Sequence, residues 1–96
     1  MSEIIASEKD RYQVVGPLTY DTVLSYIDFP QQWLSGQDNL TVNLEKVTKT
    51  DSAGVALLLE WMQKARALDR KIIFLDVPAK LHDLIRVNGL SSLFPD

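Results

Sequence analysis

The sequence predicts a single α/β domain in which a mixed β-sheet is covered by helices mainly on one face. Residues 40–44 alternate apolar and polar side chains, as expected of a half-buried strand. Residues 55–68 carry apolar side chains at helical spacing, with no glycine or proline among them. Residues 71–75 are nearly all apolar, which is typical of a central strand covered by helices. The predicted order is ββαβαβα, with helical crossovers between strands.

The elements before residue 40 give weaker signals. Residues 3–8 suggest a short first strand, and residues 11–15 form a better one that Gly16 and Pro17 end. A loop is expected at residues 36–39, immediately ahead of the strand at 40–44. The sheet should therefore begin with two consecutive strands.

A first helix is expected between these strands and the loop. Thr19 or Asp21 could cap its N-terminus. Its apolar positions recur at helical intervals: Leu24, Ile27 and Leu34. Pro30 lies within this stretch, so we expect a kink or a break near residues 28–30.

A last helix is expected to begin at Pro78, because apolar residues recur at helical spacing after it. Pro78 suits the first helical position, and Leu81, Leu84 and Ile85 should face inward. Asn88 and Gly89 end the stretch with residues that tolerate left-handed backbone geometry. The helix is therefore expected to end just before residue 88.

Composition restricts the class of protein. The 96 residues suit one small domain, residues 1–96, without linkers or repeats. Hydrophobic residues make up 46% of the chain, yet no apolar run approaches the ~20 residues that span a bilayer. The first residues lack the pattern of a signal peptide, and there is no cysteine, so a cytoplasmic domain without direct membrane insertion is expected. A net charge of −3 argues against nucleic acid as a partner.

The turn formed by Asp51, Ser52, Ala53 and Gly54 is the main candidate for function. It lies between the predicted strand at 40–44 and the long helix, so it presents a carboxylate and a hydroxyl at a helix N-terminus. With Asp51 as the N-cap, Ser52 occupies the first helical position near the surface. Gly54 would leave the first turn open to close approach by a partner backbone. By spacing alone, simple helix capping is the better explanation of the same residues.

The long helix carries an apolar stripe wider than one sheet face can bury. It covers roughly 200° of the circumference, about twice the usual minimum for a core-facing helix. Either neighbouring helices cover its flanks or one flank contacts a partner. Leu57 and Trp61 are the candidate contacts on this stripe. Trp61 is the main one, because aromatic residues are enriched both in cores and at binding hot spots.

Enzymatic interpretations have little support. His82 is the only histidine, and nothing suggests that it contacts Ser52 as a base would contact a nucleophile. No His, Cys or carboxylate cluster has metal-ligand spacing, and no glycine-rich phosphate loop is present. No catalytic residue, metal or cofactor is therefore predicted.

Taken together, these motifs resemble the STAS domain family over essentially the whole chain. The resemblance rests on the turn at 51–54, the apolar run that follows it, the strand at 71–75 and the ending at 87–90. Residues 51–61 (DSAGVALLLEW) most resemble the small cytoplasmic STAS subunits of phospholipid ABC transporters. The resemblance implies a non-enzymatic subunit that binds the transporter's ATPase, with the permease in the same complex at the inner membrane.

The resemblance also assigns roles to individual residues. Ser52 matches the family's hydroxyl position, which kinases phosphorylate in anti-sigma factor antagonists, and Asp51 and Gly54 match the family's acidic residue and glycine. In the transporter subunits the same turn and helix dock on the ATPase. Two alternatives follow: an anti-sigma factor antagonist whose partner is an anti-sigma factor kinase, and a module that binds a lipid or nucleotide. The chain departs from the family at residues 16–19 (GPLT), where a carboxylate is common, and at Ala53, where phosphorylated members often have Ser or Thr.

Overall fold

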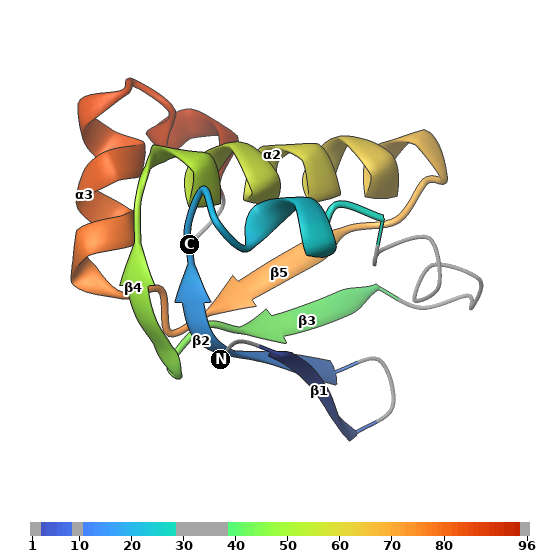
Figure 1. Cartoon of the computed structure of the whole chain (residues 1–96). Coiled ribbons are helices and arrows are strands. Elements are labelled where there is room, and N and C mark those ends of the chain that lie inside the picture. The colour runs from blue at the N-terminus through green and yellow to red at the C-terminus, as the bar shows by residue number, and fades with distance from the viewer. Residues whose placement is uncertain (1–2, 9–10, 29–38, 95–96) are drawn as a thin grey trace.

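The computed structural model describes residues 3–8, 11–28 and 39–94 (Figure 1). The strands are β1 (Glu3–Glu8), β2 (Arg11–Leu18), β3 (Leu40–Asn43), β4 (Val47–Thr50) and β5 (Ile72–Leu75). The helices are α2 (Ser52–Ala67) and α3 (Ala79–Val87), with the 3₁₀ turns η1 (Val23–Ser25) and η2 (Ser91–Leu93). The long helix thus begins and ends where the sequence predicts.

The strands form one mixed sheet. Its order is β1-β2-β3-β5, with β4 pairing the far end of β2. β1 runs antiparallel to β2, and the other pairs are parallel. The helices and η1 lie on the same side of the sheet, as Figure 1 shows. The predicted fold class, a mixed sheet with helices on one face, is confirmed.

The core lies between this sheet face and α2. Leu40 and Val42 of β3 are fully buried, whereas Thr41 and Asn43, which alternate with them, are half-buried, as expected of a one-sided sheet. Val14 and Leu18 of β2 are likewise fully buried. α2 contributes the largest fully buried side chain, Trp61.

The prediction of a helix after β2 is wrong for the part of it that the structure describes. Residues 23–25 form only the 3₁₀ turn η1, with no side-chain cap at Thr22. Leu24, expected to face inward, is 80% exposed. A 3₁₀ turn of three residues is too short to form the continuous apolar face that a longer helix would bury. Leu34, the proline at position 30 and the expected loop at 36–39 fall mostly or wholly outside the described residues.

The strand β4 was not expected, so the predicted order ββαβαβα is incomplete. Its polar residues Thr48 and Lys49 are both exposed, while Val47 and Thr50 are buried. This pattern does not alternate, because the register on β2 shifts between Gly16 and Pro17. β4 matters for the site because it leads directly into Asp51.

β5 is not the central strand that its apolar sequence suggests. It ends the described sheet, paired with β3 alone. Ile72 and Phe74 are buried under the helices, but Ile73 and Leu75 on the other face are 39% and 37% exposed. The apolar run therefore reflects one buried and one half-open face.

The last helix agrees with the sequence. Pro78, with φ −60°, is the N-cap and not the first helical residue, so the helix begins at Ala79, one residue later than expected. Leu81 and Ile85 are buried and Leu84 is partly buried. Asn88 caps the C-terminus, and Gly89 takes the left-handed φ of +70° that glycine accommodates without strain.

Gly54 allows the first turn of α2 to pack directly on the end of β2. A Cβ at this position would lie 2.6 Å from the carbonyl oxygen of Leu18 and 2.7 Å from Oγ1 of Thr50. Gly54 is buried, so the backbone that approaches it belongs to this chain and not to a partner. The expectation that Gly54 opens the turn to a partner is therefore wrong.

We predict that Gly54→Ala lowers the free energy of unfolding by about 1–3 kcal/mol, because the added methyl would overlap a backbone carbonyl that cannot move easily. In an unobstructed helix the same change stabilises by about 1 kcal/mol. Urea denaturation of the two proteins measures the difference, with Ser52→Ala in the same turn as the control. A variant as stable as the parent would contradict the close packing.

Candidate functional site

The Asp51 carboxylate connects the start of α2 to the turn after β2. Asp51 has extended backbone geometry and is the N-cap of α2. Its Oδ1 accepts hydrogen bonds from the backbone N–H of Ala53 (2.9 Å) and Gly54 (3.3 Å). Its Oδ2 accepts one from the backbone N–H of Tyr20 (3.1 Å). One side chain thus satisfies free N–H groups at the helix start and positions a second segment beside it.

Ser52 is the first residue of α2 and is exposed. Ala53 beside it is half-buried, and Ala56, one turn further, is exposed. Ser52 and Ala56 share a helix face because they are four residues apart. The surface at the N-terminus of α2 therefore offers a hydroxyl on a background of small side chains, at the end of the helix that favours negative charge.

Residues 19–28, called the strap here, run alongside α2 (Figure 1). At its start, Thr22 Oγ1 accepts a hydrogen bond from the Thr19 N–H (3.0 Å) and donates to the Pro17 carbonyl (3.1 Å). These bonds form a compact turn in which Thr19 is buried. Together with the Asp51 bond to Tyr20, they fix the beginning of the strap against the helix start.

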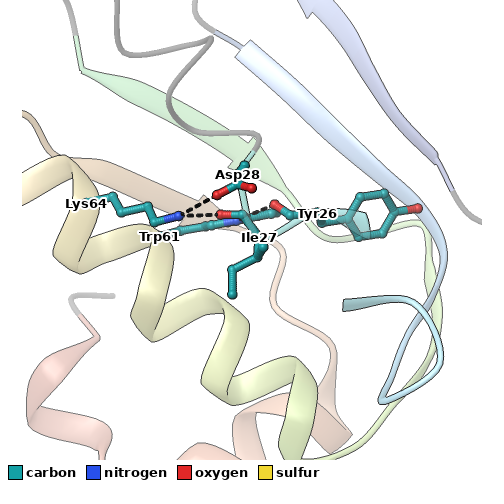
Figure 2. Close-up of polar contacts among 5 residues, drawn as sticks. All are labelled: Tyr26, Ile27, Asp28, Trp61 and Lys64. Carbon is teal, nitrogen blue, oxygen red and sulfur yellow. Dashed lines mark hydrogen bonds and ion pairs between the residues drawn. The ribbon is translucent and has the colours of Figure 1, made fainter. Parts of the chain in front are cut away.

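The end of the strap is held by side chains of α2, as Figure 2 shows. Trp61 Nε1 donates to the carbonyl of Tyr26 (2.9 Å), and Lys64 Nζ donates to the carbonyl of Ile27 (2.9 Å). Lys64 also pairs with the exposed carboxylate of Asp28 (3.1 Å). The strap is thus bound to α2 at both ends.

The structure divides the predicted site residues into surface and core. Asp51, Ser52 and Ala53 lie together at the surface of the turn. Gly54 and Leu57 are buried, with Leu57 3% exposed. Trp61 is 0% exposed, and its indole N–H is already paired. The hypothesis that Leu57 and Trp61 contact a partner is wrong, because the strap and α3 cover the flanks of the stripe.

Sequence reasoning missed the exposed residues of the strap. Tyr20 and Leu24 are 77% and 80% exposed. The spacing of Leu24 and Ile27 fits a helix, so it does not indicate an exposed position for Leu24, and Tyr20 has no periodic partner. No pattern in the sequence would have placed these residues beside the turn at 51–54.

The described residues contain no group of three or more metal-ligating side chains. His82 is exposed on α3 and lines a cavity of about 300 Å³. Its lining is Phe74, Leu75, Asp76, Val77, His82, Ile85, Ser91 and Phe94. Ser52 is not among the residues that line this cavity. Within residues 3–8, 11–28 and 39–94, no helix has the length and hydrophobicity to cross a bilayer.

The chain belongs to the STAS domain family: residues 2–95 match the family described as the MlaB STAS domain. STAS domains are protein-interaction and regulatory modules. A search of curated proteins found no match.

Solved structures share this fold at low sequence identity. The unphosphorylated anti-sigma factor antagonist SpoIIAA is 17% identical with a TM-score of 0.67, covering 90% of this chain and 82% of that chain. Phosphorylated SpoIIAA, a Bacillus cell fate determinant, is 18% identical with a TM-score of 0.70, covering 100% and 90%. A sulfate transporter family protein from Wolinella succinogenes is 12% identical with a TM-score of 0.75, covering 97% and 76%. These likenesses show the STAS fold.

We predict that Trp61→Ala lowers the free energy of unfolding by about 3–5 kcal/mol, the usual cost of removing a large core side chain. Trp61→Phe should cost less, because it keeps most of the apolar volume and loses chiefly the bond to Tyr26. Thermal and urea denaturation measure both. Leu68→Ala, half-exposed in the same helix region, should change stability by no more than about 0.5 kcal/mol. A Trp61→Ala protein as stable as the parent would contradict the burial of Trp61 in the core.

Proposed function

We propose that this chain is a non-enzymatic, cytoplasmic subunit that binds the ATPase of an ABC-type phospholipid transporter and supports or regulates it. The observation that carries the proposal is the match to the MlaB STAS domain over residues 2–95. In this role the chain would act in maintaining outer-membrane lipid asymmetry. It would sit at the inner membrane through the ATPase and the permease, without inserting into the bilayer.

The surface of Asp51, Ser52 and Ala53 supports this proposal. Ser52 is exposed at the start of a helix whose cap is already made by Asp51. Its hydroxyl is therefore not needed for the fold and is available to a partner. Its exposed neighbour on the helix, Ala56, is small, so a partner surface can approach this face of α2 closely.

A non-enzymatic role also fits the residues available. The chain has one histidine and no cysteine, so acid–base and thiolate chemistry have few candidates. Asp51 is committed to three backbone N–H groups, which leaves little of its carboxylate for proton transfer. The exposed Ser52 hydroxyl and the small side chains beside it on α2 are suited to binding another protein.

A second candidate is an anti-sigma factor antagonist that binds an anti-sigma factor kinase and is controlled by phosphorylation of Ser52. The exposed hydroxyl on a fold shared with phosphorylated SpoIIAA favours it. The absence of a carboxylate at residues 16–19 weighs against it, because an acid there would help to hold a metal–nucleotide complex near the hydroxyl. Purified chain tested for binding to the ATPase and to an anti-sigma factor kinase separates the two candidates.

We predict that Ser52→Glu folds normally and loses the complex with the ATPase. The helix dipole tolerates a carboxylate at this end in the free protein. Against a partner surface packed on a small hydroxyl, the added carboxylate is larger than the serine and must lose its water, which costs several kcal/mol. Ser52→Ala should fold and bind with intermediate affinity. Calorimetric titration after circular dichroism measures this, and parental affinity in Ser52→Glu would remove Ser52 from the interface.

We also predict that the isolated chain does not hydrolyse ATP, because its sequence has no phosphate-cradling loop. Deleting the chain should instead lower the ATPase activity or the stability of the partner. A coupled phosphate-release assay on the isolated chain, the ATPase alone and the complex measures ATP hydrolysis by each. The melting temperature of the ATPase with and without the chain measures its stability. Turnover by the purified chain with Mg²⁺ would contradict a non-enzymatic role.

A further inference from the structure

The strap carries two large exposed side chains, and it begins beside the proposed binding surface. Tyr20 is 77% exposed, although its backbone N–H is bound by Asp51, the residue immediately before Ser52. Leu24 is 80% exposed and belongs to η1, which contacts α2. Single exposed apolar residues are ordinary on protein surfaces. Two large ones on one short segment, fixed beside the same helix, form a feature that needs an explanation.

The strap is held in place before any partner arrives. The Asp51 carboxylate fixes its start at Tyr20, and Trp61 and Lys64 fix its end at Tyr26 and Ile27. Side chains on a segment with such restraints lose little backbone freedom when they are bound. Tyrosine also has few rotatable bonds, so it contributes contact area at low entropic cost.

The start of α2 and the strap differ in the size of their exposed side chains. Ser52 and Ala56 are small exposed residues of α2, whereas Tyr20 and Leu24 are large exposed residues of the strap, whose turn η1 contacts the same helix. A partner that packs closely on the small residues of α2 would receive the larger side chains in an apolar recess. Buried aromatic and aliphatic anchors of this kind often supply most of the affinity of an interface.

The charge of the strap indicates a protein as the partner. Residues 19–28 contain Asp21 and Asp28 and no lysine or arginine. Asp28 is paired with Lys64, and Asp21 is exposed next to Tyr20. An acidic residue beside the projecting tyrosine is repelled by an anionic lipid surface and complements a basic rim around an apolar pocket.

We infer that Tyr20 and Leu24 anchor the partner ATPase by inserting into an apolar pocket with a basic rim, while Ser52 packs beside them. The inference rests on the proposed function and names the residues that supply its affinity. Asp51 is a positioning residue in this arrangement, since it holds Tyr20 next to Ser52. The strap and the start of α2 then form one continuous surface.

The test measures the affinity of the purified ATPase for the full chain and its variants by calorimetric titration. Tyr20→Ser and Leu24→Ser should each weaken binding by about tenfold or more, as hot-spot truncations do, and Tyr20→Phe should bind nearly as the parent. Val87→Ser is the matched control, since Val87 is 71% exposed on α3, and it should bind as the parent. Melting temperatures of these surface variants should stay close to the parental value.

The outcomes separate the inference from the proposed function. If the parent chain does not bind the ATPase, the proposed function fails and the inference fails with it. If Ser52→Glu loses binding while Tyr20→Ser and Leu24→Ser bind as the parent, the inference alone fails. If the strap variants lose binding and Ser52→Glu does not, anchoring by Tyr20 and Leu24 holds, and the part of the inference that packs Ser52 beside them is overturned. Flotation with phosphatidylglycerol vesicles that depends on Tyr20 would identify a lipid surface and overturn the inference.

Discussion

The Asp51 carboxylate is the interaction on which the arrangement of the surface depends. One oxygen satisfies N–H groups of the first turn of α2, and the other holds Tyr20 of the strap. A serine or threonine cap has a single side-chain oxygen and could not make both sets of bonds in the same geometry. The carboxylate therefore does more than begin a helix: it sets the distance between two chain segments that are 31 residues apart in sequence. The backbone of Tyr20 lies next to the residue that precedes Ser52 because of it.

The packing beneath this surface explains why a binding role is compatible with stability. Gly54 lets α2 lie directly on the end of β2, and Trp61 fills the space between α2 and the strap. The indole N–H pairs with the Tyr26 carbonyl, so a large aromatic side chain is buried without an orphaned donor. Thr50 is the exception among the described residues, with a buried hydroxyl that makes no hydrogen bond. Gly54 and Trp61, which pack α2 on the rest of the fold, are thus buried, whereas Ser52, Tyr20 and Leu24 face solvent.

Much of the fold could be predicted from the sequence, because its strongest elements combine local propensity with periodicity. The strand at 40–43 alternates cleanly, and the helix at 52–67 has a cap at one end and no internal breaker. β4 could not be predicted, because four residues on a shifted register show no alternation. The segment after β2 also could not, because its apolar spacing fits a helix while its structure depends on bonds from α2, which are tertiary.

The candidate site shows the same division between local and tertiary information. Asp51 and Ser52 could be identified because helix capping and helix dipoles are local properties that a short sequence encodes. The prediction that Leu57 and Trp61 contact a partner is wrong, because the width of the apolar stripe indicates how much of the helix is covered and not which element covers it. Once the strap lies along α2, the excess apolar face is internal. The coverage that buries Trp61 also brings Tyr20 and Leu24 to the surface, so the same tertiary packing removes one candidate anchor and exposes another.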